Sequence, residues 1–183
     1  MKRSEINSAI QRSKDIFERH GWALPPNPRW DVTDFGLGDF EKCGLVLVNL
    51  AEQKEYCEKL MCVQKDQLTP MHCHAQKKED IICRFGKLAI RFDVDTPNVK
   101  LQVNNDWDLV PADKPLVLAS GERVTLTPGL KHEFWAESDY AVVGEVSTAN
   151  DDVSDNYFKN EDVGRFSQIV EDEAPVVKLV SDG

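Results

Sequence analysis

The spacing of apolar and polar positions divides the chain into one amphipathic helix followed by many short strands. Between residues 4 and 20, apolar or small side chains recur every three or four positions, which is the period of an α-helix with one buried face. Ser4 is the expected N-cap of this helix, and Gly21 is its expected stop. His20 would lie in the last turn, where we expect it to interact with the helix dipole rather than to bind a metal. The buried face comprises Ile6, Ala9, Ile10, Ser13, Ile16 and Phe17.

From residue 43 onward the apolar residues gather in short runs that are separated by Gly, Pro, Ser or Asp. Many short runs at this spacing are typical of an antiparallel sandwich or barrel. We expect residues 85–87 to form a hairpin turn between two neighbouring strands, and the run 174–180 is a candidate edge strand. The other expected strands are residues 45–50, 56–63, 81–84, 88–92, 116–118, 123–126, 133–135 and 141–143.

These elements predict an all-β fold with an N-terminal α-helix, in a single domain over residues 1–183. A chain of 183 residues is long enough for one domain with a full core and short for two. Residues 1–30 hold the helix and a proline-rich wrap, in which Trp22 and Trp30 are expected packing anchors. Residues 31–150 form the β-barrel, and residues 151–183 are expected to pack on it.

Composition and charge exclude several classes of partner. The formal net charge is −10 and the pI is about 4.9, which argues against nucleic acid or an anionic membrane as a partner. The sequence shows no run of about 18 apolar residues that would span a bilayer, and its charged first residues lead us to expect no signal peptide. Its five cysteines lack CxxC spacing, so we expect reduced, buried thiols in a cytoplasmic protein.

The candidate chemistry is concentrated around two histidines at alternate positions. If His72 and His74 lie on an extended segment, both side chains point to the same face, and Cys73 points to the opposite face. Glu79 can return to that face from the next strand through a short turn at residues 75–77. His132 is a fourth candidate, much later in the chain. Imidazole and carboxylate ligands without thiolate suit Mn, Fe, Co, Ni or Zn, and the sequence does not choose among them.

The spacing of these residues resembles the two motifs of the cupin superfamily. The first motif, HxHx(4)Ex(6)G, is matched by His72, His74, Glu79 and Gly86. The second motif is matched by Gly121, Pro128, Gly129 and His132, although Ala136 replaces its final asparagine. The resemblance implies a double-stranded β-helix, or jelly-roll barrel, with the two histidines, the glutamate and His132 as metal ligands.

A narrower resemblance, to the bacterial D-lyxose isomerase family, extends over nearly the whole chain. It is carried in order by residues 1–7, 72–81, 126–132, 144–152 and 164–166. The resemblance implies a manganese-dependent cupin that interconverts D-lyxose and D-xylulose, often acts also on D-mannose and D-fructose, and is commonly a homodimer. The preferred sugar stays open.

The expected chemistry requires a metal, a base and groups that bind the sugar. Three imidazoles and one carboxylate leave two open positions on a six-coordinate ion, as chelation of O1 and O2 of a sugar requires. The ion would act as a Lewis acid, while a base moves a proton between C1 and C2 through a cis-enediol. A hydride shift is the competing route.

Two carboxylates outside the ligand set are candidates for the base. Glu145 is unexpected in the apolar run 142–146, where desolvation would raise its pKa, unless it faces outward. Glu161 lies in the segment that resembles the family. At the family's lysine position, Lys77 is expected to donate to a sugar oxygen or to stabilise enediolate charge. Arg165 and Asp152 are expected to hydrogen-bond hydroxyls at the far end of the sugar.

Two other functions compete with the isomerase. An iron-dependent cupin dioxygenase also needs open metal positions, but it consumes oxygen. A non-catalytic sugar-binding cupin would bind sugars without aldose–ketose exchange, and would tolerate the loss of both Glu145 and Glu161.

Overall fold

The N-terminal helix has the predicted buried face but begins two residues further upstream than Ser4 suggests. The computed structural model describes residues 1–148, 151, 154–164 and 167–182, and α1 spans Arg3–Arg19. Lys2 is the N-cap, and its backbone N–H donates to the Glu5 carboxylate at 2.7 Å. Ser4 is therefore not the cap, because its N–H and hydroxyl both donate to Asp172 instead. The helix ends before Gly21, which has a φ of +74°.

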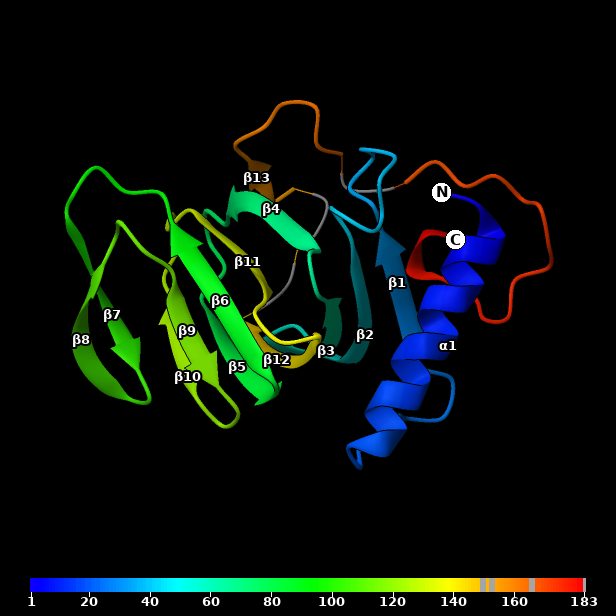
Figure 1. The fold of residues 1–183 in the computed structure, drawn as a ribbon, viewed down its shortest axis with the longest axis horizontal. Coiled ribbons are helices and arrows are strands. Elements are labelled where there is room, and N and C mark those ends of the chain that lie inside the picture. Colours follow the sequence, from blue (N-terminus) through cyan, green and yellow to red (C-terminus); the bar gives the residue numbers. More distant parts are fainter. Residues whose placement is uncertain (149–150, 152–153, 165–166, 183) are drawn as a thin grey trace.

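The strands form two antiparallel sheets, and the predicted all-β fold with an N-terminal helix is confirmed (Figure 1). The larger sheet has the order β1 (Arg29–Thr33), β2 (Leu45–Glu52), β3 (Tyr56–Gln64), β12 (Tyr140–Thr148), β5 (Glu79–Phe85), β10 (Arg123–Leu126), β7 (Asn98–Val103) and β8 (Asp106–Pro111). The smaller sheet has the order β13 (Tyr157–Phe158), β4 (Leu68–Cys73), β11 (His132–Ala136), β6 (Lys87–Phe92) and β9 (Leu116–Ala119).

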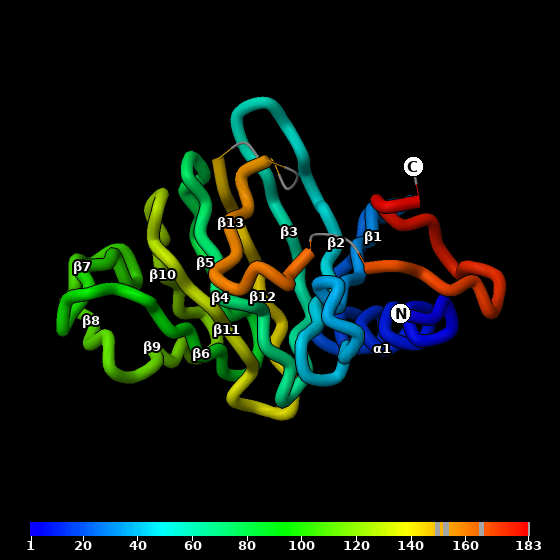
Figure 2. The backbone as a smooth tube through the Cα atoms, turned by 90° about the horizontal axis from the view of Figure 1, so that it is seen from above, coloured from blue at the N-terminus to red at the C-terminus, as the bar shows by residue number. Residues whose placement is uncertain are grey.

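Strand β2 shows why the apolar runs are continuous rather than alternating. Leu45 and Leu47 belong to the core between the two sheets, whereas Val46 and Val48 belong to a second core beneath α1. Successive side chains of a strand point to opposite faces, so a strand that is buried on both faces needs apolar residues at every position. Figures 1 and 2 place α1 beside β1 and β2, at the end of the larger sheet opposite β7 and β8.

The predicted hairpin at residues 85–87 is wrong. Strands β5 and β6 follow each other directly, yet β5 pairs with β10 and β12 while β6 pairs with β9 and β11. The chain therefore passes from one sheet to the other at Gly86, which has a φ of +86°. A Cβ atom on Gly86 would lie 2.5 Å from both Ser138 Oγ and Tyr140 O, so glycine is required at this corner.

The C-terminal run 174–180 does not form the predicted edge strand. It contributes a single parallel bridge between Leu179 and Trp30, and a 3₁₀ turn follows at Val180–Asp182. Trp30 is fully buried and stacks on Phe17, as expected of a packing anchor. Among the described residues, neither α1 nor the 3₁₀ turn is long and apolar enough to cross a bilayer.

Candidate metal centre and active site

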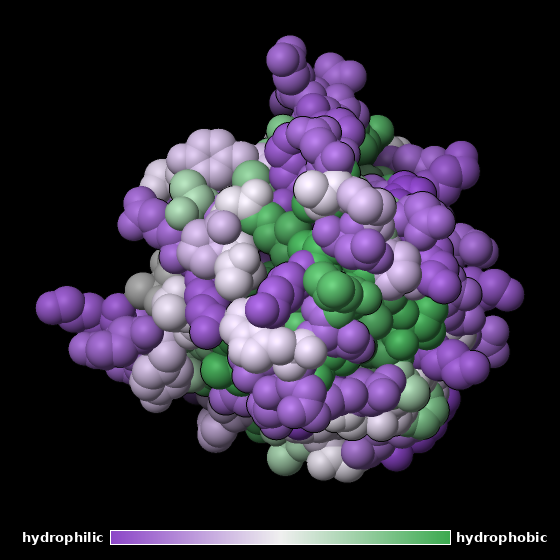
Figure 3. Space-filling model, turned by 90° about the vertical axis from the view of Figure 1, so that its left-hand side faces the viewer, coloured by the Kyte–Doolittle hydropathy of each residue, from purple (hydrophilic) through white to green (hydrophobic). Residues whose placement is uncertain are grey.

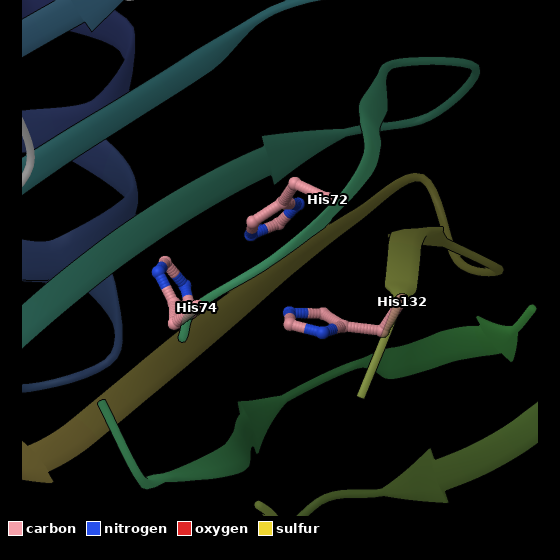
Figure 4. Close-up of side chains that lie close together, drawn as sticks. All are labelled: His72, His74 and His132. Carbon is pink, nitrogen blue, oxygen red and sulfur yellow. The ribbon is translucent and has the colours of Figure 1, made fainter. Parts of the chain in front are cut away.

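Three histidines converge between the two sheets. His72 lies on β4 and pairs across the strands with His132, the first residue of β11, while His74 directly follows β4. One nitrogen of each ring lies within 4.8 Å of the others, and all three side chains are buried. Figure 4 shows the rings pointing into a common space. The predicted alternation at positions 72 and 74 therefore places both rings on one face.

Glu79 reaches the same point from the opposite sheet, where it is the first residue of β5. Its Oε1 atom lies 3.5 Å from His74 Nε2 and 3.3 Å from His132 Nε2. The expected short turn after His74 does bring Glu79 to the histidines, but it crosses from one sheet to the other. Three imidazoles and one carboxylate face each other in a buried position.

Backbone carbonyls set the tautomer of all three imidazoles. His72 Nδ1 lies 2.7 Å from Pro70 O, His74 Nδ1 lies 2.7 Å from Asp155 O, and His132 Nδ1 lies 3.0 Å from Leu130 O. A carbonyl oxygen can only accept, so each Nδ1 carries the proton and each Nε2 presents a lone pair. Metal-binding histidines are commonly oriented in this way.

The electrostatics of the cluster favour neutral imidazoles. Burial holds the pKa of His72 well below its usual range and lowers the pKa of His74. Within the described part of the chain, the buried Nε2 of His132 has no hydrogen-bond partner, and the Glu79 oxygen 3.3 Å away is itself an acceptor. An unsatisfied buried lone pair is costly. A divalent cation would accept all three lone pairs, so the donor set fits a metal.

A buried ion-pair network adjoins the cluster. Lys77 Nζ lies 2.9 Å from Glu79 Oε2 and 3.0 Å from Glu145 Oε1. Burial opposes charge on Lys77, but Glu145 and Glu79 outweigh it and raise the lysine pKa above its usual value. Burial also opposes charge on Glu79, yet the ammonium of Lys77 outweighs it and holds the Glu79 pKa well below its usual range. Lys77 therefore binds one oxygen of Glu79 and leaves Oε1 turned toward the imidazoles.

These groups line one end of a cavity between the two sheets. The polar end carries the three histidines, Lys77, Glu79 and Glu145. The remaining wall is mainly apolar and includes Phe35, Leu45, Leu47, Met61, Phe134 and Phe158. A cavity with a few convergent polar groups on an apolar wall is typical of a site for a small polar molecule.

The model of the D-lyxose isomerase family matches residues 27–183. The chain belongs to the D-lyxose isomerase family. It is 36% identical to the D-lyxose/D-mannose isomerase of Serratia proteamaculans, over 96% of this chain and 94% of that protein. It is 34% identical to the D-lyxose/D-mannose isomerase of Escherichia coli O157:H7, over 100% of this chain and 98% of that protein. The D-lyxose ketol-isomerase of Cohnella laeviribosi is 30% identical over 85% of this chain and 91% of that protein.

Solved structures of L-ribose isomerases share the fold of this family member. The Cellulomonas parahominis enzyme with L-ribose has a TM-score of 0.72 at 16% identity, over 93% of this chain and 98% of that chain. The Acinetobacter sp. DL28 enzyme in complex with L-ribose has a TM-score of 0.72 at 15% identity, with the same coverage. The likeness extends over nearly the whole chain, and at this identity it shows the fold alone.

The structure brings only some of the other expected residues to the cavity. Lys77 and Glu145 are buried in it, so the outward-facing alternative for Glu145 is wrong. Glu161 is exposed in the turn after β13 and does not line the cavity. Asp152 and Arg165 lie outside the described residues. Cys73 is half-buried and pairs with Tyr157, away from the histidine group.

Lys59 is a cavity residue that the sequence analysis missed. It lies on β3 directly opposite Glu145, is buried, and places Nζ 3.9 Å from Glu145 Oε1. Alternation along β3 puts Lys59 on the same face as Met61 and Val63, both in the core between the sheets. A lysine at an inward position of an apolar strand is therefore a signal available from the sequence.

Proposed function

We propose that the protein is a metal-dependent aldose–ketose isomerase that interconverts D-lyxose and D-xylulose, and that also acts on D-mannose and D-fructose. The observation that carries this proposal is the joint burial of three oriented imidazoles and Glu79 at the end of a cavity that also holds Lys77 and Glu145. The choice of D-lyxose and D-mannose as substrates is based on membership of the D-lyxose isomerase family and on the names of the relatives.

His72, His74, Glu79 and His132 are the proposed ligands of one divalent ion, which we propose to be Mn²⁺. Neutral nitrogen donors and one carboxylate suit Mn²⁺ among other divalent ions. A divalent ion in this position would polarise the sugar carbonyl.

The proposed reaction is a proton transfer with no net oxidation. A carboxylate removes the proton from C2 of the aldose and returns it to C1, while a hydroxyl proton moves from O2 to O1 through a cis-enediol. Glu145 is proposed as this base because of its burial in the cavity. Glu161 is the second candidate, because its turn follows Phe158 on the cavity wall and leads to Gly164, which donates to Phe35 O.

Lys77 is proposed to stabilise the negative charge that develops on the sugar oxygens. Its ammonium is held between Glu79 and Glu145 at the polar end of the cavity. A preorganised cation in a buried site stabilises a developing oxyanion more than the same charge does in water. Arg165 and Asp152 are proposed to bind the distal sugar hydroxyls.

A homodimer in the cytoplasm is the proposed working form. Apolar side chains are visible on the side of the molecule that carries β7 and β8 (Figure 3). On β8, an edge strand of the larger sheet, Trp107 and Leu109 are 64% and 65% exposed. An exposed apolar edge supports self-association. The five cysteines are free thiols, which supports a reducing compartment.

The test is to remove metal with a chelator, restore Mn²⁺ and assay a panel of pentoses and hexoses for ketose formation under anaerobic conditions. We expect D-xylulose from D-lyxose without oxygen consumption. Turnover that requires oxygen would favour the dioxygenase. Sugar binding without ketose formation, with any divalent metal, would favour the non-catalytic cupin.

A further inference from the structure

Asp155 connects the metal cluster to a segment that lies 80 residues away in the chain. Its side chain is buried, and its carboxylate accepts hydrogen bonds from three successive backbone N–H groups. Oδ1 lies 2.7 Å from Ala75 N, Oδ2 lies 3.0 Å from Lys77 N, and both oxygens lie 3.2 Å from Gln76 N. One carboxylate thus binds every N–H of the turn at residues 75–77.

The backbone of Asp155 binds the same motif from a second direction. Its carbonyl oxygen accepts the Nδ1–H of His74 at 2.7 Å, which sets the tautomer and the orientation of that ring. His74 is also held through its own carbonyl, which accepts from Gly129 N at 2.7 Å. Asp155 therefore orients one proposed ligand and fixes the turn that immediately follows it.

The turn at residues 75–77 has to satisfy several geometric demands at once. It joins His74 on the smaller sheet to Glu79 on the larger sheet, and it carries Lys77 into the buried ion-pair network. Successive N–H groups that point at one anion form strong, charge-assisted hydrogen bonds. A shorter side chain at position 155 would leave the buried N–H of Lys77 without an acceptor and would release the N–H groups of Ala75 and Gln76.

We propose that Asp155 is a positioning residue that holds His74 and Lys77 in the geometry required for metal binding and turnover. The proposal rests on the proposed function, because it assigns Asp155 its role through the ligand His74. The segment around β13 would then contribute to the site in two ways, because it carries Asp155 and because its residues Asn156 and Phe158 line the cavity.

The test compares Asp155→Asn with Asp34→Asn. The first substitution keeps the backbone carbonyl for His74 but replaces one accepting oxygen by an NH₂ group that faces the donors of the turn. Asp34 is a matched control, because it is also buried and accepts from the backbone N–H groups of Gly36 and Gly38. Calorimetric titration of metal-free protein with Mn²⁺ and thermal unfolding are measured for both variants.

We expect Asp155→Asn to weaken Mn²⁺ binding by about tenfold or more, and to lower kcat more than it changes KM. Asp34→Asn should lower the melting temperature with unchanged Mn²⁺ affinity. Unchanged Mn²⁺ affinity in Asp155→Asn, with binding abolished in His74→Ala, would overturn the positioning role and leave the proposed function standing. A wild-type protein that binds no divalent metal would overturn both.

If Asp155→Asn does not fold, hydrogen exchange of the wild-type protein decides the question. The amides of residues 75–77 should exchange as slowly as those of the neighbouring strands, because a buried carboxylate accepts from each of them. Exchange at the rate of an exposed turn would overturn the proposal.

Discussion

The buried imidazoles show how single residues prepare this site for a cation. A histidine in water titrates near pH 6.5, at which protonated and neutral rings coexist. Here burial lowers the pKa of His72 and His74, and backbone carbonyls accept hydrogen bonds from the Nδ1–H groups of both rings. The lone pairs on Nε2 are therefore available at neutral pH without competition from protons.

The same pKa shifts predict that metal-free protein loses stability in acid. Below about pH 6.5 the unfolded chain binds protons at His72 and His74 that the folded protein does not bind, so the free energy of unfolding falls as the pH falls. Between pH 7.5 and 5.5 we expect a loss of about 2 kcal/mol, measured by urea unfolding. The double variant His72→Gln, His74→Gln should lose most of this pH dependence. An equally steep dependence in that variant would contradict the assignment.

Substitution of Glu145 tests whether this carboxylate is the base that transfers the proton between C2 and C1. Glu145→Gln keeps the shape of the side chain but cannot accept a proton, so we expect kcat to fall by at least about a hundredfold. Mn²⁺ affinity should be retained, because Glu145 lies outside the ligand set. Glu161→Gln is the comparison, with the same chemical change at an exposed position. A loss of turnover in Glu161→Gln alone would make Glu161 the base and Glu145 only a partner of Lys77.

The proposed ligands could be predicted from the sequence, but the residues that orient them could not. His72, His74 and Glu79 are close in the chain, so strand alternation and one turn are enough to bring them together. Asp155 meets its partners across about 80 residues, and nothing local to Asp155 indicates which N–H groups it accepts. Lys59 was accessible in principle through its inward position on β3. Asp152 and Arg165 stay predictions.

At the scale of elements, the corner at Gly86 is what places two successive strands in different sheets. The sequence pattern of two apolar runs around a glycine fits a hairpin equally well, so local turn chemistry does not distinguish the two. The difference is tertiary, since the residues that crowd Gly86 are Ser138 and Tyr140.

Alanine at this corner should destabilise the fold more than alanine at another left-handed glycine. Gly121 has a φ of +95° but no heavy atom within 4 Å of an added Cβ, so Gly121→Ala carries only backbone strain, about 1 kcal/mol. Gly86→Ala adds a clash at 2.5 Å with Ser138 and Tyr140, for a total of about 2–4 kcal/mol. Urea unfolding measures both variants, and equal losses would contradict the crowded corner.

The hairpin of β7 and β8 escaped prediction because polar and apolar residues alternate along both strands, so that neither strand forms an apolar run. Its turn residues Asn104 and Asn105 have φ values of 50° and 73°, which suit asparagine in a tight hairpin turn. Leu101 on β7 and Val110 on β8 face the core. An Asn-Asn pair between alternating strands is therefore a signal that the sequence contains, although the apolar runs alone do not reveal it.

At the scale of the whole molecule, the site exists only where the two sheets face each other. His72 and His132 come from the smaller sheet, while Glu79, Glu145 and Lys59 come from the larger one. The C-terminal segment adds Asp155 and Phe158, and it is bound to α1 through the ion pair of the buried Arg3 with the exposed Glu171. We therefore propose that residues 1–30, 31–150 and 151–183 act as a single cupin domain.

The central claim is that one divalent ion, bound by the histidine cluster and Glu79, is required for sugar isomerisation. The most direct measurement is a titration of metal-free protein with Mn²⁺, in which bound metal and D-xylulose formation from D-lyxose are followed in the same samples. We predict that activity rises in proportion to bound Mn²⁺ and levels off at about one ion per chain, and that His132→Ala shows neither. Full activity of the metal-free protein, or saturation with Mn²⁺ without any ketose product, would contradict the account.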